Sequence, residues 1–483
     1  MAESGYAEKR NPSREDTIAA AATAMSAAGI GIIRVSGPDA VRICAGLYVN
    51  AKGEHDLISH AANTISYGYI TDAAGNRVDE VMVSVFYAPR SYTTEDTVEI
   101  NSHGGMYLMG RILDLVLKAG ARLAEPGEFT KRAFLGGRID LSRAEAVMDL
   151  IASQNEFARK TALAQLEGSV CGAVQELRAK ILYEMAFIES ALDDPDTYAG
   201  DLDGYPDRLD RLCREMQEKM EGLLETGEKG EILRDGIRTA IIGRPNAGKS
   251  SLLNSLTGTE RAIVTEIEGT TRDTLEESVR VGGVQLRLAD TAGIRDTADP
   301  VEKIGIAKTK EAVFRSELVL YILDAAAGIT PEDLEIAGML LSWKEEIPSI
   351  RKCILLLNKN DLPAVADTDA AVSFFPAADG ILSCSMKTGE GLDRLGGMIG
   401  EMYQAGELAH QEEPLLTNAR HREAVRGALQ SLSLVREGIR AGMSEDFLAI
   451  DLMDAYASLG KILGEAVEDD LVEEIFSRFC MGK

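Results

Sequence analysis

The stretch Gly243-Arg-Pro-Asn-Ala-Gly-Lys-Ser250 directly follows the apolar run Arg238–Ile242, which is typical of a buried strand. It fits the pattern G-x-x-x-x-G-K-S of a phosphate-binding loop between a strand and a helix. In such a loop, successive backbone N–H groups and the positive end of the helix dipole point at phosphates. We therefore expect Lys249 to reach the β- and γ-phosphates and Ser250 to hold magnesium. Taken alone, the pattern also fits an ordinary strand-to-helix connection.

The residues downstream favour the nucleotide site. Asp290-Thr-Ala-Gly293 ends the second of two apolar runs, Glu277–Val281 and Val284–Ala289, which are joined by the turn residues Gly282-Gly283. This pattern predicts a hairpin. Asp290 is then placed to act on magnesium through water, and Gly293 to meet the γ-phosphate.

A third motif identifies the base. Asn358-Lys-Asn-Asp361 follows the strand-like run Cys353–Leu357. A carboxylate at its end can accept hydrogen bonds from the ring N–H and the amino group of guanine. Adenine offers no such pair of donors, so it would leave the carboxylate unpaired, which is costly. Ser385-Met-Lys387 would complete the base pocket. These motifs, in this order, predict a Ras-like domain that binds GTP.

The hydrolytic residue is less evident. Ras-type enzymes orient the attacking water with a glutamine just after D-x-x-G, but this chain has Ile294 there. Either hydrolysis is negligible or another residue acts. Glu302 is a candidate, although from the residues alone a solvated, acidic helix start is the favoured explanation. Upstream, a threonine of Gly269-Thr-Thr-Arg-Asp273 would complete the magnesium shell, and Asn246 could coordinate a monovalent cation beside the phosphates.

These motifs, together with the terminal Phe479-Cys-Met-Gly-Lys483, closely resemble those of the MnmE (TrmE) family of tRNA modification GTPases over essentially the whole chain. The resemblance implies potassium at Asn246, Thr265, Ile267 and Thr270, and magnesium at Ser250 and Thr271. It also implies that Glu302 orients water, which makes Glu302, Lys249 and Asp290 the expected catalytic residues. The expected GTP-binding residues are Asn246, Ala247, Gly248, Lys249, Ser250, Ser251, Thr265, Glu266, Ile267, Glu268, Gly269, Thr270, Thr271, Asp290, Thr291, Ala292, Gly293, Asn358, Lys359, Asp361, Ser385, Met386 and Lys387.

The part before the GTPase motifs predicts an α+β domain. Runs of alternating polarity at 29–35, 65–70, 79–86 and 97–100 predict strands, and 106–117 has helical spacing. Arg34, Glu99 and Arg138 interrupt or flank apolar segments, and solvent-facing charge is the default explanation for each. The family resemblance instead implies a tetrahydrofolate-binding fold, with these three residues and Lys483 contacting the folate. It also directs Cys480 toward that site, where a nucleophilic role for its thiol is a hypothesis.

Helical patterns occupy both sides of the GTPase motifs. One begins at the capping box Ser142-Arg-Ala-Glu145, and others cover 418–439 and 444–467. We expect one all-α domain interrupted by an insertion, because the termini of a domain often lie close together. The predicted segments are a folate-binding-like and dimerisation domain at 1–139, helical parts at 140–232 and 405–483, and the GTPase domain at 233–404. The fold class is therefore multidomain α/β.

Composition limits the partners and the compartment. The formal charge is −27, with 51 Lys and Arg against 78 Asp and Glu, which makes the chain a poor stand-alone RNA binder. If tRNA is the substrate, we expect a more basic partner, or a local basic patch on this chain, to hold much of it. The family implies a homodimer that acts with an FAD-dependent MnmG-type protein, as a heterotetramer. The six cysteines are scattered without a C-x-x-C pair, which suits reduced thiols in the cytoplasm. Acidic residues interrupt the basic N-terminal region, which argues against a signal peptide, and we expect no membrane span.

We therefore predict a potassium-stimulated GTPase that, with its FAD-dependent partner, installs a (carboxymethyl)aminomethyl group at C5 of the tRNA wobble uridine. A tetrahydrofolate derivative would supply the carbon. The alternatives are a ribosome-assembly GTPase that times the binding of ribosomal RNA, and a switch that only assembles partners.

Overall fold

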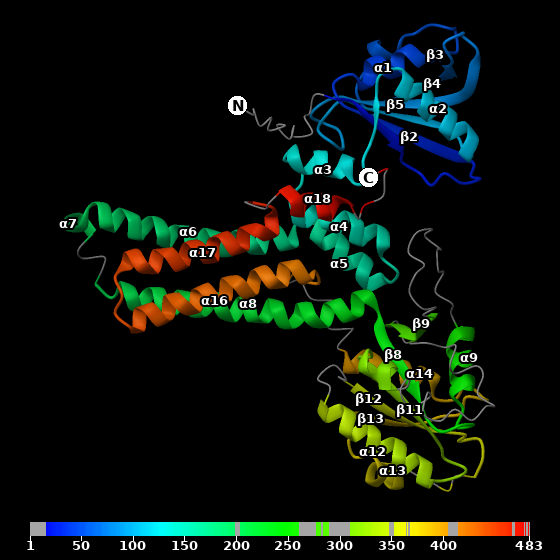
Figure 1. Cartoon of the computed structure of the whole chain (residues 1–483), viewed down its shortest axis with the longest axis vertical. Coiled ribbons are helices and arrows are strands. Elements are labelled where there is room, and N and C mark those ends of the chain that lie inside the picture. The colour runs from blue at the N-terminus through cyan, green and yellow to red at the C-terminus, as the bar shows by residue number, and fades with distance from the viewer. Residues whose placement is uncertain are drawn as a thin grey trace, which may run out of the picture. The chain divides into compact units, whose positions relative to one another are not determined.

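The structure is a computed structural model that describes residues 16–198, 203–259, 277–281, 284–288, 310–346, 352–363, 365, 368–403, 414–465, 469–477, 479 and 482. It forms two compact units (Figure 1). Unit 1 comprises residues 1–148, 165–185 and 453–483, and unit 2 comprises 149–164 and 186–452. Among the described helices, none is long and apolar enough to cross a membrane.

Unit 1 is built on a seven-stranded sheet with the order β3-β4-β5-β6-β2-β1-β7. Its strands are β1 (Ile18–Ala21), β2 (Ile30–Ser36), β3 (Tyr48–Asn50), β4 (Thr64–Thr71), β5 (Arg77–Phe86), β6 (Thr97–His103) and β7 (Arg122–Leu123). All neighbours are antiparallel except β1 and β7. The helices of this part are α1 (Ala40–Leu47), α2 (Met106–Lys118) and α3 (Glu128–Leu135), with the short 3₁₀ helix η1 (Leu57–Ser59). The strands and the helix predicted from the sequence correspond to β2, β4, β5, β6 and α2.

The two faces of this sheet differ because side chains alternate along each strand. One face supplies Ile33, Val83 and Ile100 to a core that also contains Ile43 of α1 and Ile112 of α2. Arg34 and Glu99, which are directly opposite each other on β2 and β6, lie on the other face. Helices α1 and α2 therefore cover one face, whereas Phe129 of α3 packs on the other face beside β1, against Ile18 and Ala20.

The C-terminal residues pack within unit 1. Phe476 of α18 (Asp469–Ser477) and Phe479 join Leu141 and Ala144 in a small core. Leu141 begins α4 (Leu141–Ala152). Residues of α4, α5 (Glu156–Glu167), α6 (Ser169–Asp193) and α17 (Glu445–Leu463) belong to both units.

Unit 2 contains a six-stranded sheet with the order β13-β12-β11-β8-β10-β9. Its strands are β8 (Ile237–Ile242), β9 (Glu277–Val281), β10 (Val284–Leu288), β11 (Leu318–Asp324), β12 (Lys352–Asn358) and β13 (Gly380–Ser383). β9 pairs antiparallel with β10, as the hairpin prediction requires, and the other pairs are parallel. Apolar side chains bury both faces, in two separate cores. The accompanying helices are α9 (Lys249–Thr259), α12 (Pro331–Glu346), α13 (Thr368–Phe374) and α14 (Leu392–Met402).

The long helices of unit 2 are α8 (Tyr205–Asp235) and α16 (Ala419–Arg440), which lie side by side (Figure 1), and α7 (Pro195–Tyr198) is a short turn before α8. A Cβ atom on Gly227 of α8 would stand 2.6 Å from the carbonyl oxygen of Leu416, so this glycine allows the chain leading into α16 to lie directly on α8. Only Gly236, with φ of 84°, separates α8 from β8. The helix therefore leads almost directly into the strand that carries the phosphate-binding pattern.

Candidate nucleotide-binding site

The phosphate-binding loop lies at the carboxyl end of β8, where open parallel sheets hold their ligands. Gly243 and Gly248 have φ of 154° and 113°, in the region that favours glycine. A Cβ atom on Gly243 would collide with the carbonyl oxygen of Ile322, and one on Gly248 with the Asn358 side chain. The two glycines therefore let the loop backbone lie directly against β11 and β12, where neither position has space for a side chain.

Lys249, the first residue of α9, folds back over this loop. Its Nζ donates to the carbonyl oxygens of Gly243 at 2.6 Å and of Arg244 at 2.9 Å. Burial lowers the pKa of its ammonium group. Asn246 is exposed and has a left-handed backbone with φ of 62°, and Ser250 is exposed at the start of α9. A partly desolvated cation beside a helix N-terminus suits the phosphates of a nucleotide.

Asn358 ties the three described loops of the site together. Its Nδ2 donates to the carbonyl oxygen of Ala247 at 2.8 Å, and its Oδ1 accepts from the backbone N–H of Met386 at 3.0 Å. The side chain is 2% exposed. One amide thus fixes the phosphate loop and the loop after β13 relative to the end of β12.

The expected base-recognition residues lie next to this amide. Asp361 Oδ1 accepts from Ser385 Oγ at 2.7 Å, and Lys387 Nζ is 4.0 Å from its other oxygen. Lys359 has a left-handed backbone with φ of 69°, and its Nζ donates to Asp324 at 2.7 Å. The structure therefore brings together residues 246–251, 358–361 and 385–387. Asp324 and Arg244 also belong to this cluster, although the sequence motifs do not single them out.

The other predicted residues of the site lie outside the described residues. These are Thr265, Glu266, Ile267, Glu268, Gly269, Thr270, Thr271, Asp290, Thr291, Ala292, Gly293 and Glu302. Cys480 and Lys483 also fall outside the described part of the chain.

A second cluster lies on the face of the unit 1 sheet opposite α1 and α2. Arg34 Nε donates to Glu99 Oε1 at 2.9 Å, and the side chains are 13% and 22% exposed, so neither is the solvent-facing charge expected by default. Arg34 Nη1 also donates to the carbonyl oxygen of Gly482 at 3.2 Å. A Cβ atom on Gly482 would stand 2.5 Å from the carbonyl oxygen of Ala21, so the C-terminal tail fits this place closely.

Tyr92 connects this pair to the third predicted residue. The guanidinium carbons of Arg34 and Arg138 lie 5.2 Å and 4.9 Å from the centre of its ring, and Arg138 Nη1 donates to its carbonyl oxygen at 2.9 Å. Sequence reasoning missed Tyr92, because an aromatic residue in a loop gives no signal of the charges around it. A partly buried carboxylate, two cations and an aromatic ring fit a flat, polar heterocycle that carries a negatively charged tail.

Comparisons with known proteins place the chain in a family. The family model described as "MnmE helical domain" matches residues 141–480, and "GTP-binding protein TrmE N-terminus" matches 17–138. The tRNA modification GTPase MnmE of Lachnoclostridium phytofermentans is 46% identical over 471 residues, which cover 97% of this chain and 100% of the relative. This chain belongs to the MnmE family of tRNA modification GTPases. As a member of the MnmE family it is a GTP hydrolase, and the predicted family and enzyme class are confirmed.

A second relative agrees. The MnmE of Alkaliphilus metalliredigens is 43% identical, with 97% of this chain and 99% of the relative covered. Among solved structures, a GTP-binding protein of Sulfolobus solfataricus in complex with GDP is 18% identical, with a TM-score of 0.26 and coverage of 47% of this chain and 67% of that one.

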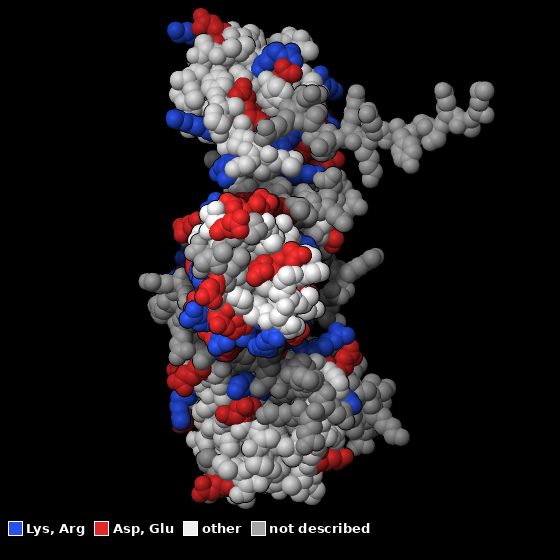
Figure 2. Space-filling model, turned by 90° about the vertical axis from the view of Figure 1, so that its left-hand side faces the viewer, with Lys and Arg blue, Asp and Glu red and all other residues white. Residues whose placement is uncertain are grey.

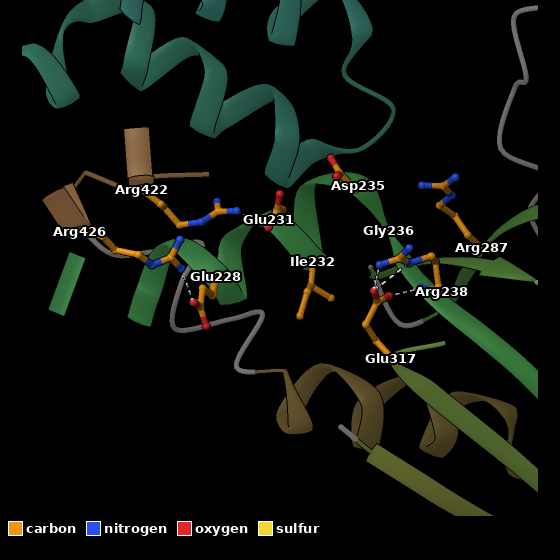
Figure 3. A pocket seen from close by; sticks show the side chains of 10 residues that line it. All are labelled: Glu228, Glu231, Ile232, Asp235, Gly236, Arg238, Arg287, Glu317, Arg422 and Arg426. Atoms are coloured by element: carbon orange, nitrogen blue, oxygen red, sulfur yellow. Dashed lines mark hydrogen bonds and ion pairs between the residues drawn. The ribbon is translucent and has the colours of Figure 1, made fainter. Parts of the chain in front are cut away.

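A cavity of about 370 Å³ lies at the amino end of β8, at the opposite end of this strand from the nucleotide loops (Figure 3). Its walls carry ion pairs between Arg238 and Glu317 and between Arg426 and Glu228. Arg422 pairs with Glu231 and also donates to the carbonyl oxygens of residues 416 and 417. In this MnmE-family chain, charged contacts therefore fasten the end of α8 to the start of α16, and a separate ion pair joins β8 to the residue before β11.

Proposed function

We propose that this chain hydrolyses GTP as part of the modification of the tRNA wobble uridine. Family membership supports tRNA modification, and the arrangement around Asn358 supports guanine-nucleotide binding, because it connects the phosphate loop to both base-recognition loops. The carboxylate of Asp361 would accept hydrogen bonds from the guanine edge. Lys249 would neutralise developing charge on the transferred phosphoryl group.

We further propose that Mg²⁺ is held by Ser250 and Thr271, with Asp290 acting through water, and that K⁺ is held by Asn246, Thr265, Ile267 and Thr270. The exposed, left-handed Asn246 supports this assignment, since its side chain is available beside the loop. A metal ion supplies positive charge to the transferring phosphoryl group. Glu302 would then orient the attacking water in place of glutamine.

The cation assignment predicts much faster GTP turnover in potassium than in sodium. Asn246→Ala should abolish the difference between the two salts. Glu302→Ala should lower kcat while leaving GTP affinity nearly unchanged, because it removes an interaction made only in the transition state. Equal wild-type rates in the two salts would exclude the potassium site.

The cluster around Tyr92 supports a site for a tetrahydrofolate derivative, which would supply the one-carbon unit. Glu99 would accept hydrogen bonds from the pterin, and Arg34, Arg138 and Lys483 would hold the glutamate tail. Cys480 would lie near this site as a possible nucleophile. The full-length chain should bind 5-formyltetrahydrofolate, and Glu99→Gln should weaken this binding at least tenfold. Glu80→Gln, an exposed carboxylate on the same sheet face, is the matched control.

We propose that the chain works as a cytoplasmic homodimer with an FAD-dependent MnmG-type partner, in a heterotetramer. The net charge of −27 supports a partner that holds much of the tRNA, and Figure 2 shows acidic side chains on each part of the chain that it presents. We also propose the predicted domain boundaries, with the Ras-like GTPase domain inserted into the helical one. The packing of α16 against α8 supports this insertion, since these helices flank the six-stranded sheet in the sequence.

Mass-spectrometric nucleoside analysis of tRNA, from cells with and without the gene, tests the whole proposal. Loss of aminomethyl-type wobble uridines, restored by wild type but not by Asp290→Ala, is the expected result. Unchanged tRNA nucleosides together with an altered ribosome profile would instead support the ribosome-assembly GTPase.

A further inference from the structure

Asp324 ends β11 between two loops of the nucleotide site. β11 pairs with β8 on one side and with β12 on the other. Its carboxyl end is therefore flanked by the phosphate loop and by the loop that begins at Asn358, with which Asp324 is in register. Asp324 thus stands between the loop expected to hold phosphates and the loop expected to hold the base.

The two carboxylate oxygens of Asp324 have separate partners. Oδ1 accepts from the backbone N–H groups of Ala326 at 3.1 Å and Ala327 at 3.2 Å, which fixes the turn that follows β11. Oδ2 accepts from Lys359 Nζ at 2.7 Å and lies 3.6 Å from Arg244 Nη2. One oxygen therefore faces a cation from each nucleotide loop.

Arg244, the second residue of the phosphate loop, has one more anchor. Its Nε lies 3.4 Å from Asp333 Oδ2, and the Asp333 side chain is fully buried. The same oxygen accepts from Thr330 Oγ1 at 2.7 Å. Arg244 is thus held between two carboxylates, and within the described part of the chain Asp324 is the one of the two that also pairs with Lys359.

The partial burial of these side chains strengthens the interactions between their charges. The side chains of Asp324 and Arg244 are 10% and 17% exposed, and water screens a partly buried pair less than a surface pair. Burial by itself raises the pKa of Asp324. The hydrogen bond from Lys359 and the charges of Lys359 and Arg244 lower this pKa by more than burial raises it, so it lies below its usual range. The carboxylate is consequently ionised at neutral pH.

We propose that Asp324 is a positioning residue that couples the base-recognition loop to the phosphate loop. By attracting Lys359 and Arg244 to one oxygen, it sets the separation of the two loops to that required by a guanine nucleotide. This inference rests on the proposed GTP site. In Asp324→Asn the amide can still accept from the turn through Oδ1, but it would present an N–H group to two cations and lose both.

The test measures GDP affinity by calorimetry and GTP turnover for the full-length chain. Asp324→Asn should weaken GDP binding roughly ten- to a hundredfold, as expected for loss of one hydrogen bond between charged groups and of one ion pair, and raise KM for GTP while kcat changes less than about threefold. Asp379→Asn is the matched control. Asp379 also accepts from a backbone N–H, that of Cys353, and pairs with Lys352 at 3.6 Å, but at the amino end of β12. It should leave GDP affinity within about threefold of wild type.

A double-mutant cycle separates positioning from general damage. In a Lys359→Met background, Asp324→Asn should cost less than about threefold in GDP affinity, because its main partner is already absent. Additive losses, or a loss no larger than that of Asp379→Asn, would overturn the proposal. If Asp324→Asn does not fold, the double-mutant cycle of Arg244→Met and Lys359→Met tests the same link. Additive losses of GDP affinity in that cycle would also overturn the proposal. Failure of the wild type to bind GDP would instead contradict the GTP site itself.

Discussion

Lys249 makes the nucleotide site sensitive to pH. Among the described residues its ammonium group donates to the carbonyl oxygens of Gly243 and Arg244, and burial lowers its pKa. Because the folded pKa is below that of the unfolded chain, the unfolded state binds more protons between the two values. The stability of the nucleotide-free protein therefore rises with pH across that window. Phosphates reverse the preference, because they favour the charged ammonium.

GTP affinity should consequently fall as the pH rises through the lowered pKa of Lys249. Above that value the protein must take up a proton on binding, so Kd should increase up to about tenfold per pH unit. Titration calorimetry between neutral and alkaline pH measures this slope. Guanine itself also titrates at alkaline pH, and Lys249→Arg, which stays charged, gives that contribution alone. Equal slopes for the two proteins would show that Lys249 does not titrate in this range.

The cysteines offer a second test at the residue scale. Cys44, Cys171, Cys213, Cys353 and Cys384 are free and buried, and burial raises the pKa of Cys44 and of Cys384 to about 12. Thiolates react and buried thiols do not, so these five should resist alkylation in the native protein. Mass spectrometry after brief alkylation at mild alkaline pH should find rapid modification at no cysteine other than Cys480. Cys480→Ser provides the control, and fast labelling of any of the five would contradict their burial.

Sequence patterns identified the site residues that belong to motifs and missed those whose partners come from distant parts of the sequence. Lys249, Asn358 and Asp361 stand at fixed positions relative to strand ends, so spacing alone locates them. Asp324 and Tyr92 acquire their roles only when distant segments meet. An aspartate after an apolar run, or a tyrosine in a loop, carries no signal of such a partner.

At the scale of elements, the strands were predictable because alternation and apolar runs mark them directly. The helical patterns at 418–439 and 444–467 likewise correspond to α16 and α17, apart from the last residues of the second pattern. Helical spacing in the preceding segment, in contrast, extends only to about Leu224, whereas α8 continues to Asp235. Gly227 and Gly230 are unfavourable within a helix, but tertiary packing overrides this preference, since the chain before α16 lies against both.

Gly227→Ala should therefore destabilise the protein although alanine is the better helix former. The new Cβ would stand 2.6 Å from a backbone oxygen, which cannot swing away as a side chain can. We expect a loss of about 1–3 kcal/mol. Gly222→Ala is the matched control on the same helix, where nothing lies within 4 Å, and it should stabilise by about 0.5–1 kcal/mol. Thermal unfolding of both variants should shift in opposite directions, and a common direction would refute the packing argument.

At the scale of the whole molecule, the exposed β4–β5 part of the unit 1 sheet, on the face opposite α1 and α2, is a candidate dimer contact. Tyr67 and Met82 are directly opposite each other on β4 and β5 and are 48% and 52% exposed, and Ile65 beside them is also exposed. Adjacent exposed apolar side chains on a sheet are typical of a surface that meets another protein.

Met82→Lys should thus convert the proposed homodimer to monomers. A buried, unpaired ammonium in the interface would be costly, whereas the same charge on a monomer lies in water. Sedimentation of wild type and variant over a range of concentrations measures the change. Leu334→Lys replaces an equally exposed apolar residue on α12 and should leave the association state unchanged. A dimer that survives Met82→Lys would place the contact elsewhere.

The junction at Gly236 also has a mechanical consequence. α8 has 31 residues, which at 1.5 Å per residue makes a rod about 46 Å long. Because one glycine separates this rod from β8, a change of about 10° in direction at Gly236 would sweep the far end of the helix through about 8 Å. A displacement of less than one bond length at the base of the sheet would thereby move the far end of α8 by more than the pitch of the helix.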